Sequence, residues 1–148
     1  MDLSGERRFG APRSVVWAAL LDPHVLEATI PGCERLVEVA PGTFDLSMRV
    51  GIASLRGTYR GSVRVLEPRP EESYRLVVTG AGAQGAVNGT ALITLSGDDE
   101  STLVRYQGDL NAEGAVARLG GGPLSGAARL LIGQFFRALE RHVGARTA

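Results

Sequence analysis

Apolar and polar residues alternate along much of the chain, as expected for strands that bury one face and expose the other. The clearest run covers residues 43–53, where every second residue from Phe44 to Ile52 is apolar and the residues between are polar or small. Turn residues such as Pro41 and Gly42 separate the runs, which predicts an antiparallel meander. The other six predicted strands are residues 3–9, 34–39, 59–65, 74–79, 86–95 and 102–112. The strand over 3–9 is polar enough to lie at a sheet edge.

Two short helices are predicted between the first two strands, over residues 12–21 and 24–29. Pro12 suits the first helical position because its missing N–H needs no partner there. Asp22 and Pro23 separate the two helices. The apolar face of the first helix consists of Val16, Trp17, Leu20 and Leu21.

A long C-terminal helix is predicted from Leu124 onward, where apolar residues recur at steps of three and four. Residues 120–123 are expected to form a flexible or bent entry to this helix, and Gly144 its stop. A sheet with one polar face must bury the other, and this helix is long enough to cover it. The predicted fold is therefore α+β: a seven-stranded antiparallel sheet curled around the long C-terminal helix, with two short helices after the first strand. Residues 1–148 are expected to form a single domain.

Small residues recur on the predicted inner face of the sheet. Gly61, Gly108 and Ala112 lie in phase with bulky residues such as Tyr59 and Tyr106. One interpretation is a cavity beneath the helix. The other is that glycine permits the strong coiling that a sheet needs to wrap around a helix.

Charge and composition exclude several classes of function. Sixteen basic and sixteen acidic residues cancel, so no overall field favours nucleic acid as a partner. Every basic residue is Arg, which excludes Schiff-base and P-loop lysine chemistry. Cys33 is the only cysteine, and the chain shows neither an apolar signal core nor a stretch of ~18 apolar residues. We therefore expect a cytoplasmic protein.

No motif in the chain indicates catalysis, a metal or a cofactor. Residues 80–85 match G-x-G-x-x-G, but a strand rather than a helix is predicted to follow, so we expect a Gly-rich hairpin with a bulge. His24 and His142 lie at opposite ends of the chain, and neither has metal-ligand spacing to a second ligand. No serine lies in a nucleophile elbow. The chain is expected to be non-catalytic and to hold no cofactor or metal.

Two stretches resemble a known family. An Ala-Pro-Arg-Ser-Val-Val-Trp helix ending in Asp22-Pro23 leads to Ile-Pro-Gly-Cys-Glu at 30–34, and the similarity continues through 57–61, 89–91 and the entry to the terminal helix. The chain thereby resembles the CoxG family associated with aerobic molybdenum carbon monoxide dehydrogenases, within the START-like (SRPBCC), helix-grip superfamily. The resemblance covers nearly the whole chain. It implies a sheet that grips the terminal helix around a hydrophobic pocket.

The resemblance also implies an accessory role without catalysis. The implied ligand is a lipid or a lipophilic electron carrier such as a quinone, and the implied partner is a molybdenum hydroxylase-type dehydrogenase recruited to the inner face of the cell membrane. Longer members carry a tail after the last helix that is thought to reach the membrane, whereas this chain ends at Ala148. That difference favours a plain carrier of small ligands, with peripheral membrane contact left open. The residues expected to line the ligand site are Trp17, Leu20, Met48, Val50, Tyr59, Tyr106, Leu131 and Phe135.

Two alternatives remain open. A cyclase or aromatase of the same superfamily would need polar groups converging in the pocket, for which the candidates are Tyr59, Tyr74, Tyr106 and Asn88. A scaffold that binds only proteins would show an apolar surface and no internal cavity. Ile132, Phe136 and Val143 on the helix flank form either such a surface or only the edge of the pocket. The outer sheet face is expected to be basic and solvated, or to dock on an acidic protein or anionic lipid. Its arginines are Arg49, Arg60, Arg64, Arg75 and Arg105, partly neutralised by Asp45, Asp109 and neighbouring residues.

Overall fold

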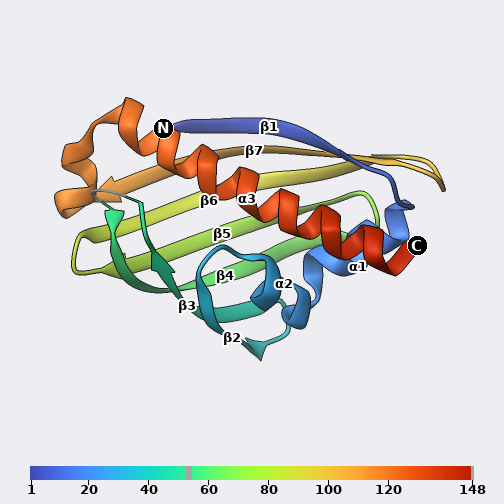
Figure 1. Ribbon diagram of the computed structural model, residues 1–148, viewed down its shortest axis with the longest axis horizontal. Helices are drawn as coiled ribbons and strands as arrows, with labels where there is room; N and C mark the ends of the chain where they lie inside the picture. Colours follow the sequence, from blue (N-terminus) through green and yellow to red (C-terminus); the bar gives the residue numbers. More distant parts are fainter. Residues whose placement is uncertain (53–54, 148) are drawn as a thin grey trace.

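The structure is a computed structural model that describes residues 1–52 and 55–147. Strand β1 is followed by two short helices, six further strands, a 3-10 helix and a long helix (Figure 1). The elements are β1 (Asp2–Phe9), α1 (Arg13–Leu21), α2 (Pro23–Thr29), β2 (Cys33–Ala40), β3 (Thr43–Val50), β4 (Gly57–Arg69), β5 (Ser73–Gly82), β6 (Gly85–Gly97), β7 (Thr102–Glu113), η2 (Gly114–Leu119) and α3 (Gly121–Thr147).

The strands form one antiparallel sheet in the order β1-β7-β6-β5-β4-β3-β2. Consecutive strands from β2 to β7 are neighbours, and β1 returns beside β7, so β1 and β2 are the two edges. The N-terminal ammonium of Met1 holds the start of β1 in place by bonding to Asp109 Oδ1 at 2.9 Å and to the Leu110 carbonyl oxygen at 3.0 Å. The predicted fold class and the edge position of the first strand are confirmed.

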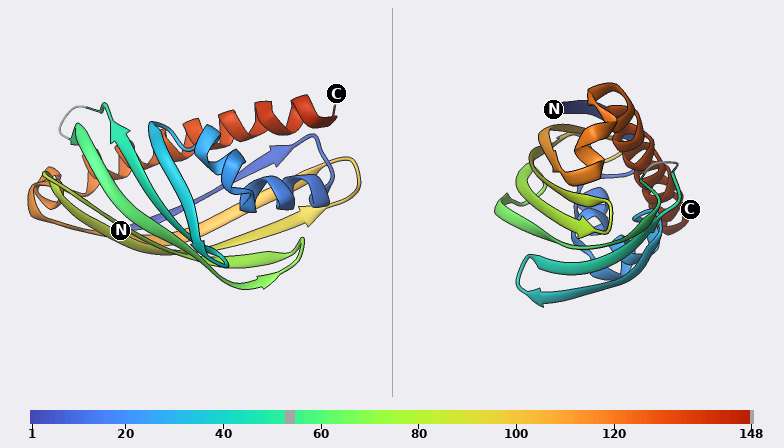
Figure 2. Two further views of the ribbon diagram at one scale, coloured as in Figure 1. Left: turned by 90° about the horizontal axis from the view of Figure 1, so that it is seen from below. Right: turned by 90° about the vertical axis from the view of Figure 1, so that its left-hand side faces the viewer.

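The sheet curls, and α3 runs along its concave side (Figures 1 and 2). The alternation seen in the sequence explains this arrangement. In β3, for example, Phe44 and Val50 are buried while Asp45 and Arg49 face solvent. Helices α1 and α2 lie between the sheet and the C-terminal half of α3 (Figure 2, left).

The short helices are positioned by local capping and by their apolar faces. Asp22 Oδ1 accepts a hydrogen bond from the backbone N–H of His24 at 2.9 Å, and Pro23 occupies the first turn of α2. Val16 and Leu20 of α1 pack into the main core beside Phe9 and Leu139. Burial of these apolar faces attaches α1 and α2 to the sheet and to α3.

Two strand details differ from the expectation. β3 ends at Val50 rather than Ala53, because Val50 pairs with Gly57, the first residue of β4, and the ladder goes no further; Ala53 lies outside the described residues. The 80–85 segment is a hairpin, but β5 and β6 pair without a register shift up to Gly82 and Gly85, so it has no bulge. The positive φ of Gly85, 126°, absorbs the change of direction instead.

α3 is longer than predicted at both ends. It begins at Gly121 rather than Leu124, because the chain turns at Gly120, which has a φ of 82°. It also continues through Gly144, since that glycine lacks the positive φ that would end a helix. Among the described residues, no helix combines the length and the apolar character that crossing a membrane requires.

The three flank residues proposed as a scaffold surface lie in the interior. Phe136 and Val143 are buried in the main core, and Ile132 packs against it. Phe136 stacks on Tyr106 with ring centroids 5.6 Å apart and tilts against Phe9 at 6.1 Å. The alternative of an exposed apolar patch at these positions is therefore wrong.

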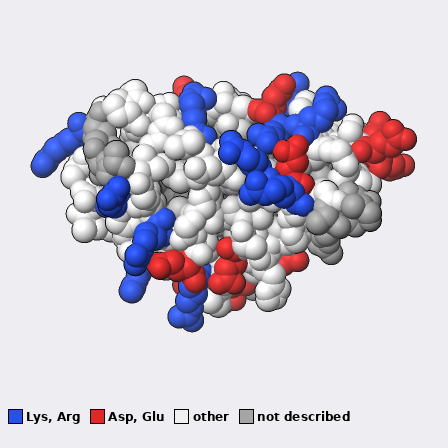
Figure 3. Space-filling view, viewed as in Figure 1, with Lys and Arg blue, Asp and Glu red and all other residues white. Residues whose placement is uncertain are grey.

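The outer sheet face carries all five arginines expected there, each of them exposed. Three form ion pairs with neighbouring glutamates: Arg49 with Glu34, Arg75 with Glu67, and Arg105 with Glu6. The other side of the molecule, where α3 lies, also mixes both signs of charge with broad uncharged areas (Figure 3).

Candidate functional site: an apolar cavity between the sheet and α3

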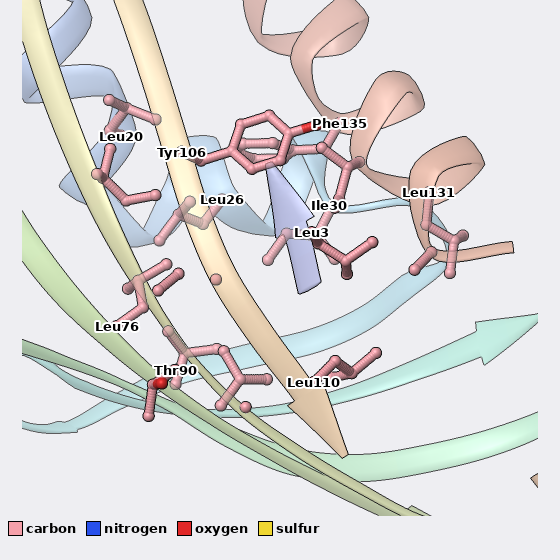
Figure 4. Close-up of a pocket in the computed structure, with 18 of the residues that line it drawn as sticks. Leu3, Leu20, Leu26, Ile30, Leu76, Thr90, Tyr106, Leu110, Leu131 and Phe135 are labelled. Atoms are coloured by element: carbon pink, nitrogen blue, oxygen red, sulfur yellow. The ribbon is translucent and has the colours of Figure 1, made fainter. Parts of the chain in front are cut away.

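A cavity of about 420 Å³, called cavity 1 below, lies between the concave face of the sheet and α3. All seven strands and the helices α1, α2 and α3 contribute to its wall. In the close-up, Leu3, Leu26 and Leu131 face the space from three different elements (Figure 4). A volume of this size falls within the range of about 300–1,000 Å³ that is typical of small-ligand sites.

A second cavity of about 280 Å³, cavity 2, lies toward the N-terminal end of α3. It is lined by residues toward the end of β3 and the start of β4. Val116 of η2 and Leu124 in the first turn of α3 also line it. The two cavities share a wall of seven residues: Ile30, Met48, Val63, Val78, Leu110, Ala128 and Leu131. The two cavities therefore lie next to each other beneath α3.

The structure brings together seven of the eight residues expected at the site. Leu20, Tyr106 and Phe135 line cavity 1, Val50 and Tyr59 line cavity 2, and Met48 and Leu131 line both. Trp17 lines neither. It packs edge-on against Tyr74, with ring centroids 5.5 Å apart, because that side of α1 meets the start of β5 rather than the open space.

The expectation omitted the contribution of α2 and of the loop after it. Leu26, Ile30 and Pro31 all line cavity 1. Their place was not apparent from periodicity, because α2 has only seven residues. Tyr74, Leu76 and Val78 of β5 also line cavity 1, and these could have been found from their phase along the strand.

Glycines shape the inner face at two cavity walls. Gly61 lines cavity 2, where an added Cβ would overlap the carbonyl oxygen of Thr79 in the neighbouring strand. Gly108 lines cavity 1, where a Cβ would come within 2.7 Å of the Thr90 carbonyl oxygen. Both glycines therefore allow adjacent strands to approach closely, and they leave space above the sheet as well.

Few polar residues line the cavities, and the two charged ones, Asp109 at cavity 1 and Arg60 at cavity 2, are exposed. Tyr74 and Tyr106 line cavity 1 and Tyr59 lines cavity 2, so all three tyrosines of the chain belong to the site. The Tyr59 hydroxyl donates a hydrogen bond to the Leu55 carbonyl oxygen at 2.9 Å. Burial raises the pKa of Tyr74 and of Tyr59, so both stay protonated at neutral pH.

Other candidate chemical groups lie away from the cavities. Asn88 and His24 are exposed. The Nε2 atom of His142 is buried without a hydrogen-bond partner in the described structure, but His142 lines neither cavity. Burial raises the pKa of the Cys33 thiol, and the carboxylates of Glu27 and Glu34 add to the shift. Within 1–52 and 55–147, no three His, Cys, Asp or Glu side chains gather as a metal site.

A curled antiparallel sheet that grips a long C-terminal helix around an apolar cavity defines the START-like, helix-grip class of proteins, to which this fold belongs. The chain is a member of the CoxG family of carbon monoxide dehydrogenase subunits, whose model matches residues 5–144. No curated protein matches the chain.

Solved structures extend this likeness. A conserved protein from Geobacillus kaustophilus superposes with a TM-score of 0.95 at 30% identity, over 98% of this chain and 96% of that one. A START superfamily protein from Mycobacterium smegmatis gives 0.75 at 12% identity, over 97% of each chain. The Zhui aromatase/cyclase from a Streptomyces species gives 0.75 at 14% identity, over 100% of this chain and 96% of that one. The last two likenesses concern the fold alone.

Proposed function

We propose that the protein is a non-catalytic carrier that holds a hydrophobic small molecule, a lipid or a quinone-like compound, in the cavity beneath α3. The observation that supports this most strongly is cavity 1, a space of about 420 Å³ with walls of aliphatic and aromatic side chains. Transfer of apolar ligand surface from water into such a space is favourable by about 25 cal/mol per Å². The lining therefore supports a hydrophobic ligand.

Binding of a neutral fluorescent hydrocarbon such as diphenylhexatriene tests this proposal. Ala128 of α3 lines both cavities, so the larger ring of Ala128→Phe should occupy space at their shared wall and abolish the fluorescence increase. Leu130, which is 47% exposed on the same helix, provides the matched control, and Leu130→Phe should bind the probe normally. If the parent protein does not bind the probe, or Ala128→Phe binds it equally well, the cavity is not a ligand site.

We further infer that the carrier acts as an accessory to a carbon monoxide dehydrogenase-type molybdenum enzyme in the cytoplasm, with peripheral contact at the inner face of the cell membrane. The description of the matching family supports the partner. Affinity purification of the tagged chain from its own host should recover a molybdenum-containing dehydrogenase. Recovery of the chain without any such enzyme, under conditions where the enzyme is expressed, would contradict this part of the proposal.

A further inference from the structure

Helix α3 carries an excess of positive charge that the rest of the chain lacks. Between Gly121 and Thr147 the sequence contains four arginines and a single acidic residue, Glu140. The whole chain has sixteen residues of each sign, so this excess is a local property of α3. A local excess of one sign on an otherwise neutral protein indicates a surface for a partner of the opposite sign.

The one acidic residue of α3 does not neutralise its arginines. Glu140 accepts a hydrogen bond at 2.8 Å from the guanidinium of Arg7, which belongs to β1. Arg137 and Arg141 are exposed, lie one helical turn apart, and form no ion pair within the described residues. Arg129 is exposed as well and pairs with no carboxylate among those residues. The charge of these three arginines is therefore free to meet a partner.

An exposed leucine lies among these arginines. Leu130 is 47% exposed, although large apolar side chains are mostly covered in this protein. It shares one side of the helix with Arg137 and Arg141, because residues seven and eleven positions apart point the same way. Gly126 and Gly133 lie beside it, and an added Cβ at either glycine would meet no heavy atom within 4 Å. The basic face of α3, as we call this side below, consists of Gly126, Arg129, Leu130, Gly133, Arg137 and Arg141.

The basic face is long and convex. The outer side of α3 lies uncovered at the surface for most of its length (Figures 1 and 2), and basic side chains lie near the centre of this side of the molecule (Figure 3). Arg129 and Arg141 are twelve residues apart, which corresponds to about 18 Å along a helix. A single small anion needs donors that converge on one point. Cations spread along a helix suit an extended anionic surface instead.

An anionic bilayer fits the basic face better than an acidic protein does. The core of a protein interface is apolar and depleted of charge, whereas this face offers one large apolar side chain, Leu130, between cations. Helices that lie in a membrane interface combine apolar side chains with arginines whose apolar stems lie among the lipids and whose charged ends stay at the phosphates. Phospholipid head groups can also move to match any spacing of the arginines.

Resting on the proposed peripheral contact with the cell membrane, we propose that the basic face of α3 docks on anionic phospholipid, with Arg137 and Arg141 at the phosphates and Leu130 between the head groups. Each arginine near such a surface strengthens binding by about fivefold, so the contact is weak and reversible. Leu131 and Phe135 of the same helix line cavity 1. Docking through this face therefore places cavity 1 directly behind the helix that meets the membrane.

Co-sedimentation with phosphatidylcholine vesicles, with and without phosphatidylglycerol, tests the role of the arginines. The parent should bind only the vesicles that contain phosphatidylglycerol, and added salt should weaken this binding, because exposed charges are screened over ~8 Å at physiological ionic strength. Arg137→Gln with Arg141→Gln should weaken it by about 25-fold. Arg35→Gln with Arg64→Gln is the matched control and should bind as the parent does. It removes the same charge from two exposed arginines of the sheet that form no ion pair within the described residues.

A tryptophan at Leu130 tests the orientation of the docked protein. In Leu130→Trp, the emission should shift to shorter wavelength with phosphatidylglycerol vesicles and should be quenched by brominated lipid. Val39→Trp is the matched control, because Val39 is 54% exposed and lies on the edge strand β2, away from α3. Its emission should not change on vesicle binding. Trp17 is present in both variants, so its contribution cancels in the comparison.

The outcomes separate this inference from the proposed function. If the parent binds no anionic vesicle, the peripheral membrane contact and this inference fail together, while binding of a hydrocarbon in cavity 1 is unaffected. If the parent binds but Arg137→Gln with Arg141→Gln binds equally well, or if Val39→Trp reports contact and Leu130→Trp does not, only the assignment to α3 fails. If soluble polyglutamate displaces the parent from the vesicles at an equal concentration of negative charge, the face recognises acidic chains rather than a bilayer, and the inference is wrong.

Discussion

Gly61 and Gly80 pair directly across β4 and β5, yet a methyl group would meet different surroundings at each. At Gly61 it would overlap the backbone carbonyl oxygen of Thr79, whereas at Gly80 it would only touch Val87. We expect Gly61→Ala to lower the free energy of unfolding by about 1–3 kcal/mol, because the strands must move apart. Gly80→Ala should leave it unchanged or raise it by up to about 1 kcal/mol, because the unfolded chain loses freedom.

Urea denaturation of the two variants and the parent checks this pair. Equal destabilisation by both would mean that glycine is needed for its flexibility rather than for space. The expected difference would show that glycine is required for the close approach of strands at Gly61 but not at Gly80.

Tyr74 also predicts how stability changes at alkaline pH. Its pKa is raised in the folded protein, so its contribution to stability is complete below the unfolded pKa of about 10 and is lost as pH rises above it. In that range the unfolded chain releases a proton that the folded chain keeps, and the free energy of unfolding falls by up to ~1.4 kcal/mol per pH unit. The chain has no lysine to titrate in the same range.

Urea denaturation at pH 8 and at half-unit steps up to pH 11 measures this slope. Tyr74→Phe should show a shallower decline than the parent. Identical slopes would mean that Tyr74 does not stay protonated in the folded protein. If only Tyr59→Phe shows a shallower slope, the decline in stability is caused by Tyr59 and not by Tyr74.

At the scale of elements, α3 is both a wall of the cavity and the element with the most glycine in exposed positions. Gly122 and Gly126 have no heavy atom within 4 Å of an added Cβ, and neither has a positive φ. Replacing both with Ala should stabilise α3 by about 1 kcal/mol per site. A firmer α3 should slow both loading and release of a neutral probe, because Leu131 and Phe135 of this helix cover cavity 1.

Stopped-flow fluorescence of probe loading and release, beside urea denaturation, checks this expectation. Gly10→Ala is the control, because Gly10 also has open space around it but lies outside α3. If the double variant gains stability and exchanges the probe at the parent's rates, movement of α3 does not admit the ligand.

The sequence predicted the existence of every strand and α-helix, because the period of two or about 3.6 is a local property of the chain, but it did not predict the 3-10 helix η2. The strand over 43–53 was assigned the correct buried face from the alternation between Phe44 and Ile52, and the structure buries Phe44 and Val50. Element ends were less accurate. β3 ends at Val50, because Val50 pairs with Gly57, the first residue of β4. This pairing between two strands cannot be predicted from the sequence of either strand alone.

The candidate site was predictable only where a strand or helix period pointed into the space. Met48, Tyr106 and Leu131 were found this way. Trp17 was misplaced, because its helical phase was correct but the docking angle of α1 directs it against Tyr74. The contribution of Ile30 depends on how α2 folds back over the sheet, which is a tertiary property.

At the scale of the whole molecule, the outer sheet face is a candidate docking surface, but ion pairs within this face neutralise part of its positive charge. Arg60 and Arg64 form no ion pair within the described residues, whereas the three other arginines of that face pair with glutamates. We expect Arg60→Gln with Arg64→Gln to change the free energy of unfolding by less than about 0.5 kcal/mol. The same variant should leave co-sedimentation with anionic vesicles unchanged at low and high salt. A salt-dependent loss of co-sedimentation would identify this face as a docking surface.

The central claim is that the space beneath α3 holds a hydrophobic molecule in the cell. Native mass spectrometry of the intact protein, purified from its own host without detergent, tests it most directly. We predict a population heavier than the chain by the mass of one small molecule, which organic solvent extracts and which is missing from Ala128→Phe but present in Leu130→Phe. A spectrum that contains only the mass of the chain, from protein that also fails to bind a neutral hydrocarbon, would contradict the claim.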